Sequence, residues 1–184
     1  MNTPEDIAGF LATQPHIVSV LEHVEALDLP DCWVAAGLIR NAIWDRLSGI
    51  PVRLETAADV DVVYFNPADL GKDADQAHEA RLRAAAPTLE WEVRNQARMH
   101  LKNGDEPYAD TEDGLRHFLE TVAAIGARLR EGRIELIAPY GVDDILKMIL
   151  RPTASGRARP HEYLARLERK RWHEIWPKLE VLTP

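Results

Sequence analysis

Two aspartates, Asp59 and Asp61, stand two residues apart in a run that is otherwise aliphatic and aromatic as far as Phe65. Successive side chains of a β-strand alternate between its faces, so these two carboxylates point the same way and can share a cation. Aspartate is depleted in strands and is rarely buried without a partner. Carboxylate oxygens on a rigid strand suit Mg²⁺ or Mn²⁺. The spacing therefore predicts a divalent-metal site, against the alternative of an edge strand with an acidic solvent face.

A third carboxylate is expected from a second acidic segment, residues 89–93, where Glu90 and Glu92 again alternate with apolar residues. Three carboxylates can hold two ions, one activating an attacking oxygen and the other holding a triphosphate and its leaving pyrophosphate. We choose Glu92 as the third ligand because Trp91 and Val93 flank it. Glu90 remains the alternative.

A phosphate-binding turn is predicted at Gly37, between a short apolar strand and an amphipathic helix. Arg40 and Asn41 fall in the first turn of that helix. A helix N-terminus offers unpaired N–H groups and a partial positive charge, and arginine adds a forked donor that matches phosphate oxygens. Glycine allows a ligand to approach the backbone closely. Gly37, Arg40 and Asn41 are therefore predicted to bind phosphate, although a plain turn at Gly37 is the simpler interpretation.

Secondary candidates follow the second acidic segment. Asn95 and Arg98 are interpreted as further nucleotide-binding residues, with Arg98 neutralising phosphate. His100 has a pKa range suited to proton transfer, but a structural hydrogen bond is the better interpretation.

Composition is that of an ordinary globular chain. The chain has 184 residues, of which 46% are hydrophobic, and we expect one domain. A lone cysteine, Cys32, excludes an internal disulfide and a Cys-rich zinc site. No apolar stretch is long enough to span a bilayer, and the N-terminus lacks the layout of a signal peptide. We therefore expect a cytoplasmic protein without a membrane partner.

Charge is distributed unevenly along the chain. The net charge is −8, yet residues 151–178 carry eight Lys/Arg against three Glu. Such asymmetry is typical of a surface that meets an anionic partner, and nucleic acid is one candidate for this basic C-terminal tail. A solvated helix face is the alternative.

The expected elements alternate between helices and strands. Helices are predicted at 4–12, 15–27, 38–47, 73–85, 111–124, 142–150 and 161–176, with a helical turn at 94–100. Strands are predicted at 32–36, 59–65 and 89–93, a hairpin at 128–138 and a loop at 152–160. We expect an α+β fold, with N-terminal helices in 1–31, a catalytic α/β core in 32–141 and C-terminal helices in 142–184.

Together these motifs resemble a known family, the bacterial nucleotidyltransferase family of the polymerase-β-like superfamily. The segments that carry the resemblance are 33–41 (WVAAGLIRN), 59–65 (DVDVVYF), 91–100 (WEVRNQARMH), 103–104, 107–108, 139–144 and 151–152. The resemblance implies a small mixed sheet flanked by helices, with a C-terminal helical extension. It also implies that Asp59, Asp61 and Glu92 hold Mg²⁺ or Mn²⁺, while Gly37, Arg40 and Asn41 lie along the triphosphate. The chain departs from the wider superfamily in having Ala36 before Gly37, and Asn41 where the tRNA-terminal nucleotide-adding enzymes have Asp.

The predicted function is transfer of a nucleoside monophosphate from an NTP to an acceptor hydroxyl, with release of pyrophosphate. The acceptor stays open between a small molecule, RNA and a protein. The alternative is a non-catalytic nucleotide- or RNA-binding module on the same fold, and a third hypothesis is one half of a toxin–antitoxin pair. The complete set of carboxylates favours the enzyme.

Overall fold

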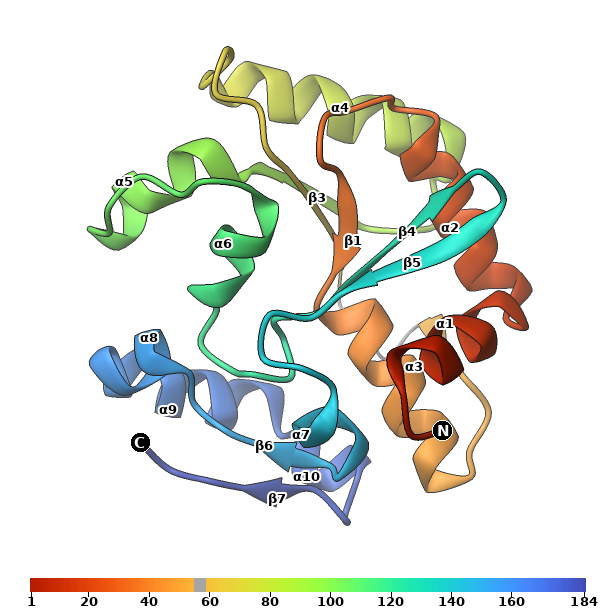
Figure 1. Ribbon diagram of the computed structural model, residues 1–184, viewed down its shortest axis with the longest axis vertical. Coiled ribbons are helices and arrows are strands. Elements are labelled where there is room, and N and C mark those ends of the chain that lie inside the picture. The colour runs from red at the N-terminus through yellow and green to blue at the C-terminus, as the bar shows by residue number, and fades with distance from the viewer. Residues whose placement is uncertain (55–58) are drawn as a thin grey trace.

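A five-stranded mixed sheet organises the molecule, and the computed structural model describes residues 1–54 and 59–184 (Figure 1). The strand order is β3-β2-β1-β4-β5, in which β2 and β3 are parallel and the other neighbours are antiparallel. The strands are β1 (Trp33–Ala35), β2 (Val60–Tyr64), β3 (Trp91–Asn95), β4 (Gly126–Arg130) and β5 (Arg133–Ile137). The expected strands and hairpin are therefore present, and the sheet is mixed as expected.

One face of this sheet is apolar and is covered by helices, which we call the packing face. Its members alternate along the strands and include Val34, Val60, Val62, Tyr64, Trp91 and Val93. They share one core with residues of α1 (Pro4–Ala12), α2 (Pro15–Glu25), α3 (Gly37–Ser48) and α4 (Lys72–Ala85). Thr3 caps α1 and Pro4 occupies its first turn, so the predicted helix start is confirmed.

The opposite face carries a smaller apolar cluster and is only partly covered. There Trp33, Ala35 and Val63 pack against Leu115 and Phe118, which lie at and just after α6 (Thr111–Arg116). The short helices η2 (Gln96–Arg98) and α5 (Met99–Asn103) precede α6 on the chain. In Figure 1, α5 and α6 lie beside the sheet, above α8 (Ala154–Ala158) and α9 (Pro160–Lys170). We call this side of the sheet the cavity face.

The C-terminal segment is anchored on α3. It contains α7 (Asp143–Leu146), β6 (Ile149–Leu150), α8 (Ala154–Ala158), α9 (Pro160–Lys170), α10 (Trp172–Ile175) and β7 (Glu180–Val181). Trp172 and Trp176 both meet Trp44 of α3 edge-on, and the Trp176 indole N–H donates to the buried Asp45 carboxylate at 2.9 Å. These contacts fix the basic tail against the helix that was predicted to bind phosphate.

Several expected elements differ in extent. The helix expected at 111–124 ends at Arg116, because backbone groups of 119–121 pair with 151–153 instead. That pairing also accounts for α8 inside the expected loop at 152–160, where Thr153 caps the helix. Gly156 lies so close to Leu119 that a Cβ there would stand 2.2 Å from its carbonyl oxygen.

Two further helices are shorter than expected, and one strand extends further than expected. The helix expected at 142–150 stops at Leu146, since Met148 adopts a φ of 56° and Ile149 begins β6, which pairs with β7. The tail helix breaks at Arg171, whose φ of 46° redirects the chain into α10. The third strand runs on through Asn95, where a helical turn was expected. Within the described ranges, no helix is long and apolar enough to cross a membrane.

Candidate active site

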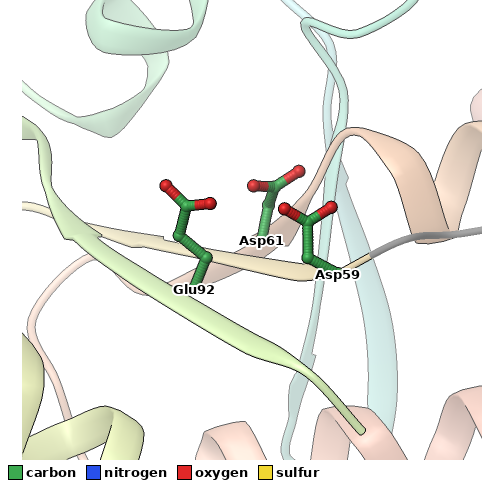
Figure 2. A group of neighbouring side chains, drawn as sticks. All are labelled: Asp59, Asp61 and Glu92. Atoms are coloured by element: carbon green, nitrogen blue, oxygen red, sulfur yellow. The ribbon is translucent and has the colours of Figure 1, made fainter. Parts of the chain in front are cut away.

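Three carboxylates converge on the cavity face (Figure 2). Asp59 immediately precedes β2, Asp61 lies within it, and Glu92 is the β3 residue paired with Asp61 in the parallel register. One ligand oxygen from each carboxylate lies within 4.8 Å of the others. Glu90 is exposed and precedes β3, and it does not belong to this group. The structure thus brings together the trio that the sequence analysis selected, with Glu92 as its third member.

Asp61 is the member of the trio whose ionised form is disfavoured, whereas Glu92 pairs with Arg94 at 2.9 Å. The pKa of Asp61 is raised to about 7, mainly by burial and also by the neighbouring Asp59 and Glu92, against the opposing effect of Arg166 and Arg40. Like charges held this close in a desolvated site favour protonation unless an opposite charge is present. An all-oxygen donor set of this kind fits Mg²⁺ or Mn²⁺.

The trio forms one wall of a cavity of about 820 Å³. Its charged lining residues within the described chain are Arg40, Arg94, Lys102, Arg159, Arg166, Arg169 and Lys170 against Asp59, Asp61, Glu92 and Glu120. Seven cations against four carboxylates make a basic cavity in a chain whose net charge is −8. Such a cavity favours anionic ligands.

Arg40 is the most constrained of these cations. It is 3% exposed, and its guanidinium carbon lies 4.5 Å from the Trp172 ring centroid and 5.2 Å from that of Trp44. Its Nε and Nη2 both donate to Asn41 Oδ1, at 3.1 and 2.8 Å. Its buried Nη1 has no hydrogen-bond partner among the described residues. Burial lowers the pKa of Arg40 to about 10, so the group stays charged at neutral pH.

Gly37 and Asn41, the other two residues predicted to bind phosphate, also line the cavity. Gly37 is the first residue of α3, and Ala36 before it adopts a φ of 52°, a left-handed conformation that non-glycine residues rarely use. That conformation turns the chain sharply from β1 into α3. Asn41 is 2% exposed and orients Arg40, so it has a role that its position alone did not predict.

Two predicted nucleotide-binding residues lie elsewhere. Asn95 is fully buried and donates to the backbone carbonyls of Asn66 and Asp69. Arg98 pairs with the buried Asp75 of α4. Neither side chain is among the described residues that line the cavity, and the same holds for His100. Alternation along β3 explains Asn95, because a residue three positions after Glu92 points to the packing face.

Comparison with known proteins agrees with this geometry. Residues 22–181 match a family described as nucleotidyltransferase. The chain belongs to this nucleotidyltransferase family. A solved structure described as revealing a CCA-adding enzyme head domain is 31% identical, with a TM-score of 0.86 over 100% of this chain and 98% of that one. The polymerase-β-like fold expected from the sequence is therefore confirmed. Among curated proteins, none matches the chain.

More distant structures share the fold alone. The Thermotoga maritima CCA-adding enzyme complexed with tRNA is 12% identical, with a TM-score of 0.56 over 98% of this chain and 42% of its own. A CCA-adding enzyme complexed with CTP is 11% identical, with a TM-score of 0.58 over 98% of this chain and 43% of its own. This nucleotidyltransferase thus spans less than half the length of those enzymes.

Several residues of the nucleotidyltransferase cavity were not predicted individually. Glu120 is 1% exposed and pairs with Arg166 of α9 at 2.9 Å. Burial lowers the pKa of Lys170, helped by Arg166 and Arg40 and opposed by Asp59. These interactions place the end of α9 near the trio. The basic tail was the signal for Arg166 and Lys170, but no local pattern marked Glu120.

Proposed function

We propose that this nucleotidyltransferase depends on divalent metal ions and transfers a nucleoside monophosphate from an NTP to a hydroxyl group. One observation carries the proposal. Three carboxylates that fit a divalent cation share a cavity with Arg40, a buried arginine whose Nη1 has no hydrogen-bond partner among the described residues. Carboxylates for metal and a forked cation for phosphate are the two requirements of phosphoryl transfer from a triphosphate.

The triphosphate would lie between the trio and the cations that face it. Arg40 lines the cavity, and Asn41 and the two tryptophans restrict its rotation. An arginine held in this way loses little conformational entropy on binding phosphate. Arg166 and Lys170 extend the positive charge toward Asp59. The CTP and ATP complexes of CCA-adding enzymes on the same fold support an NTP as the ligand.

The reaction needs positioning and charge neutralisation more than covalent chemistry from the protein. When bound, divalent cations would neutralise triphosphate charge and lower the pKa of the acceptor hydroxyl. Asp59, Asp61 and Glu92 would hold those cations, and Arg40 would orient the phosphates. The acceptor oxygen forms a bond to the α-phosphorus as the bond to the bridging oxygen breaks. Pyrophosphate leaves with the electron pair, and the hydroxyl proton passes to solvent.

A labelling experiment tests the proposal. The protein is incubated with each α-³²P-labelled NTP, Mg²⁺ or Mn²⁺, and cell extract fractionated into small molecules, RNA and protein. We expect label to appear in one fraction, with loss of transfer in Asp61→Asn. Asp73→Asn, an exposed carboxylate on α4, is the matched control and should retain activity. NTP binding without label transfer in any fraction would favour a non-catalytic nucleotide-binding module, and full activity of Asp61→Asn would contradict the metal assignment.

A further inference from the structure

The cavity has a second cationic end, away from the trio. Arg159, the residue before α9, lines this end, whereas Lys170 at the last position of α9 lies near Asp59. At 1.5 Å per residue, α9 separates these two positions by about 16 Å. Cations at the two ends of α9 therefore serve different parts of whatever fills the cavity.

His117 lies at this second end and is held in a fixed orientation. Its Nδ1 stands 2.9 Å from Asp105 Oδ2, and its ring stacks on Tyr108 with centroids 4.4 Å apart. Tyr108 in turn donates its hydroxyl to the same Asp105 carboxylate. His117 lines the cavity but Asp105 and Tyr108 do not. The imidazole edge that carries Nε2 is therefore the one available to a ligand.

Arg159 and Lys102 lie at the same end of the cavity as His117. We call these three residues the distal cluster. Arg159 Nη1 donates to Asn103 Oδ1 at 3.2 Å and Nη2 donates to the His117 carbonyl at 3.0 Å, so the guanidinium is positioned by α5 and by the chain after α6. Among the described residues it forms one ion pair, with the exposed Glu162 at 3.7 Å. Lys102 is exposed and lines the cavity, and none of the ion pairs among the described residues includes it.

The distal cluster has no part in the proposed binding of the triphosphate. The trio has its own cations in Arg40, Arg166 and Lys170. A fixed imidazole, a positioned guanidinium and an ammonium group line the same end of the cavity, and all three can donate to the oxygens of a phosphate group. An acceptor that reaches the trio with its hydroxyl must also pass through this cavity.

We propose that the distal cluster binds a phosphate group of the acceptor, so that the acceptor is a phosphate-bearing alcohol. This inference rests on the proposed nucleotidyl transfer and specifies its second substrate. The phosphate belongs either to the backbone of a nucleic-acid strand that ends in the reacting hydroxyl or to a small phosphorylated alcohol. Both sources place an anion at Lys102, His117 and Arg159 and a hydroxyl toward the carboxylates.

The test uses two probes and two kinds of variant. A fluorescein-labelled single-stranded hexaribonucleotide is titrated by anisotropy, and inorganic phosphate is titrated while the His117 imidazole is followed by NMR. Lys102→Met and His117→Gln remove single members of the cluster, and Lys178→Met, an exposed lysine outside the cavity, is the matched control. Binding of Mg·ATP is measured by calorimetry on each protein, with Lys170→Met as the variant expected to weaken it.

We expect Lys102→Met and His117→Gln to weaken probe binding about tenfold each, the loss of one charge-assisted hydrogen bond. Mg·ATP affinity should stay unchanged in both variants. A strand acceptor predicts that the hexaribonucleotide binds and that its salt slope falls by about 0.7 for each lost contact. A small phosphorylated acceptor predicts that inorganic phosphate shifts the His117 signals while the hexaribonucleotide does not bind.

Two results would overturn the inference: neither probe binding the wild type, or both probes binding Lys102→Met and His117→Gln as tightly as Lys178→Met. Failure of the proposed function is a different result, namely that the wild type does not bind Mg·ATP. Thermal unfolding of each variant keeps the two apart, because a folded Lys102→Met protein with normal ATP affinity reports on the distal cluster alone.

Discussion

The two faces of the central sheet are built from the same strands but have different roles. On the packing face, Val62 of β2 and Val93 of β3 are fully buried beneath helices. On the cavity face, Asp61 and Glu92 of the same strands stand at the neighbouring positions and gather negative charge. One residue along a strand therefore separates a contribution to stability from a contribution to chemistry.

The two faces also differ in how their buried polar and charged groups are paired. On the packing face, Tyr64 donates its hydroxyl to the buried Asp75 carboxylate at 2.8 Å, and Arg98 neutralises that carboxylate. The cavity face leaves a raised pKa on Asp61 and an unpartnered Nη1 on Arg40 among the described residues. Functional sites commonly keep such unsatisfied groups, which a ligand then satisfies. Substitutions on the two faces should accordingly affect different measurements.

The largest expected effect is on nucleotidyl transfer, and it should distinguish Glu92 from Glu90 in the second acidic segment. Glu92→Gln should reduce nucleotidyl transfer at least about 100-fold. Mutation of residues that only support a metal ligand typically lowers metal affinity or activity about 10–100-fold, and Glu92 would be a direct ligand. Glu90→Gln, on an exposed side chain outside the trio, should leave kcat and KM unchanged. The measurement is steady-state transfer at saturating Mg²⁺. Equal losses in both variants would contradict the assignment of Glu92.

The next effect concerns Arg98, which sequence reasoning assigned to phosphate and the structure places beside Asp75. Arg98→Met should lower the free energy of unfolding by about 3–5 kcal/mol, because it leaves the Asp75 carboxylate buried without its counter-charge. The KM for NTP should be unchanged. Arg83→Met, an exposed arginine on α4, is the control for both denaturant unfolding and kinetics. A raised KM with normal stability would restore Arg98 to the nucleotide site.

How far the sequence predicted this site depends on whether local or long-range structure positions each residue. Asp59 and Asp61 were predictable because two-residue spacing on a strand is enough to place both carboxylates on one face. Arg40 followed from its place at a helix start. Glu120 was not predictable, because residues 119–121 pair with 151–153 across a long stretch of chain. His117 was not predicted either, because Arg159, which donates to its backbone carbonyl, lies 42 residues further along the chain.

The two predicted residues that lie away from the cavity, Asn95 and Arg98, show the effect of small errors in element boundaries. With the third strand ended at Val93, Asn95 and Arg98 were interpreted as part of a helical turn beside the site. The strand in fact continues through Asn95. Alternation then sends the Asn95 side chain to the packing face, where it binds the backbone after β2. Fold class survived this error because it depends on the order of elements, whereas side-chain direction changes with each residue.

A third effect tests the electrostatic cost on the cavity face itself. The pKa of Asp61 is raised to about 7 from a usual value of 3.8, so the folded state disfavours its ionised form. With divalent metals chelated, stability should therefore be lost as the pH rises from about 4 to about 7. The loss is at most about 4 kcal/mol, from 1.36 kcal/mol for each unit of pKa difference.

Asp61→Asn should remove this loss and be more stable than the wild type at pH 8 in chelator, while being inactive in Mg²⁺. Thermal unfolding between pH 4 and pH 8 provides the measurement. Asp73→Asn again serves as the control, since its carboxylate is exposed. If Asp61→Asn were less stable than the wild type across this range, the carboxylate would be a stabilising group and the two faces would not differ as argued.

The smallest effect tests whether the packing face can be weakened without disturbing the chemistry. Ile7 of α1 is fully buried in the core beneath the sheet. Ile7→Val should lower the free energy of unfolding by about 1 kcal/mol through the loss of one methylene group and the small void that remains. At temperatures where the variant stays folded, kcat/KM for NTP should remain within about twofold, because a small void beneath α1 does not require β2 and β3 to shift. A large fall in kcat/KM at unchanged fold would mean that the trio depends on close packing behind it, and that the two faces act as one unit.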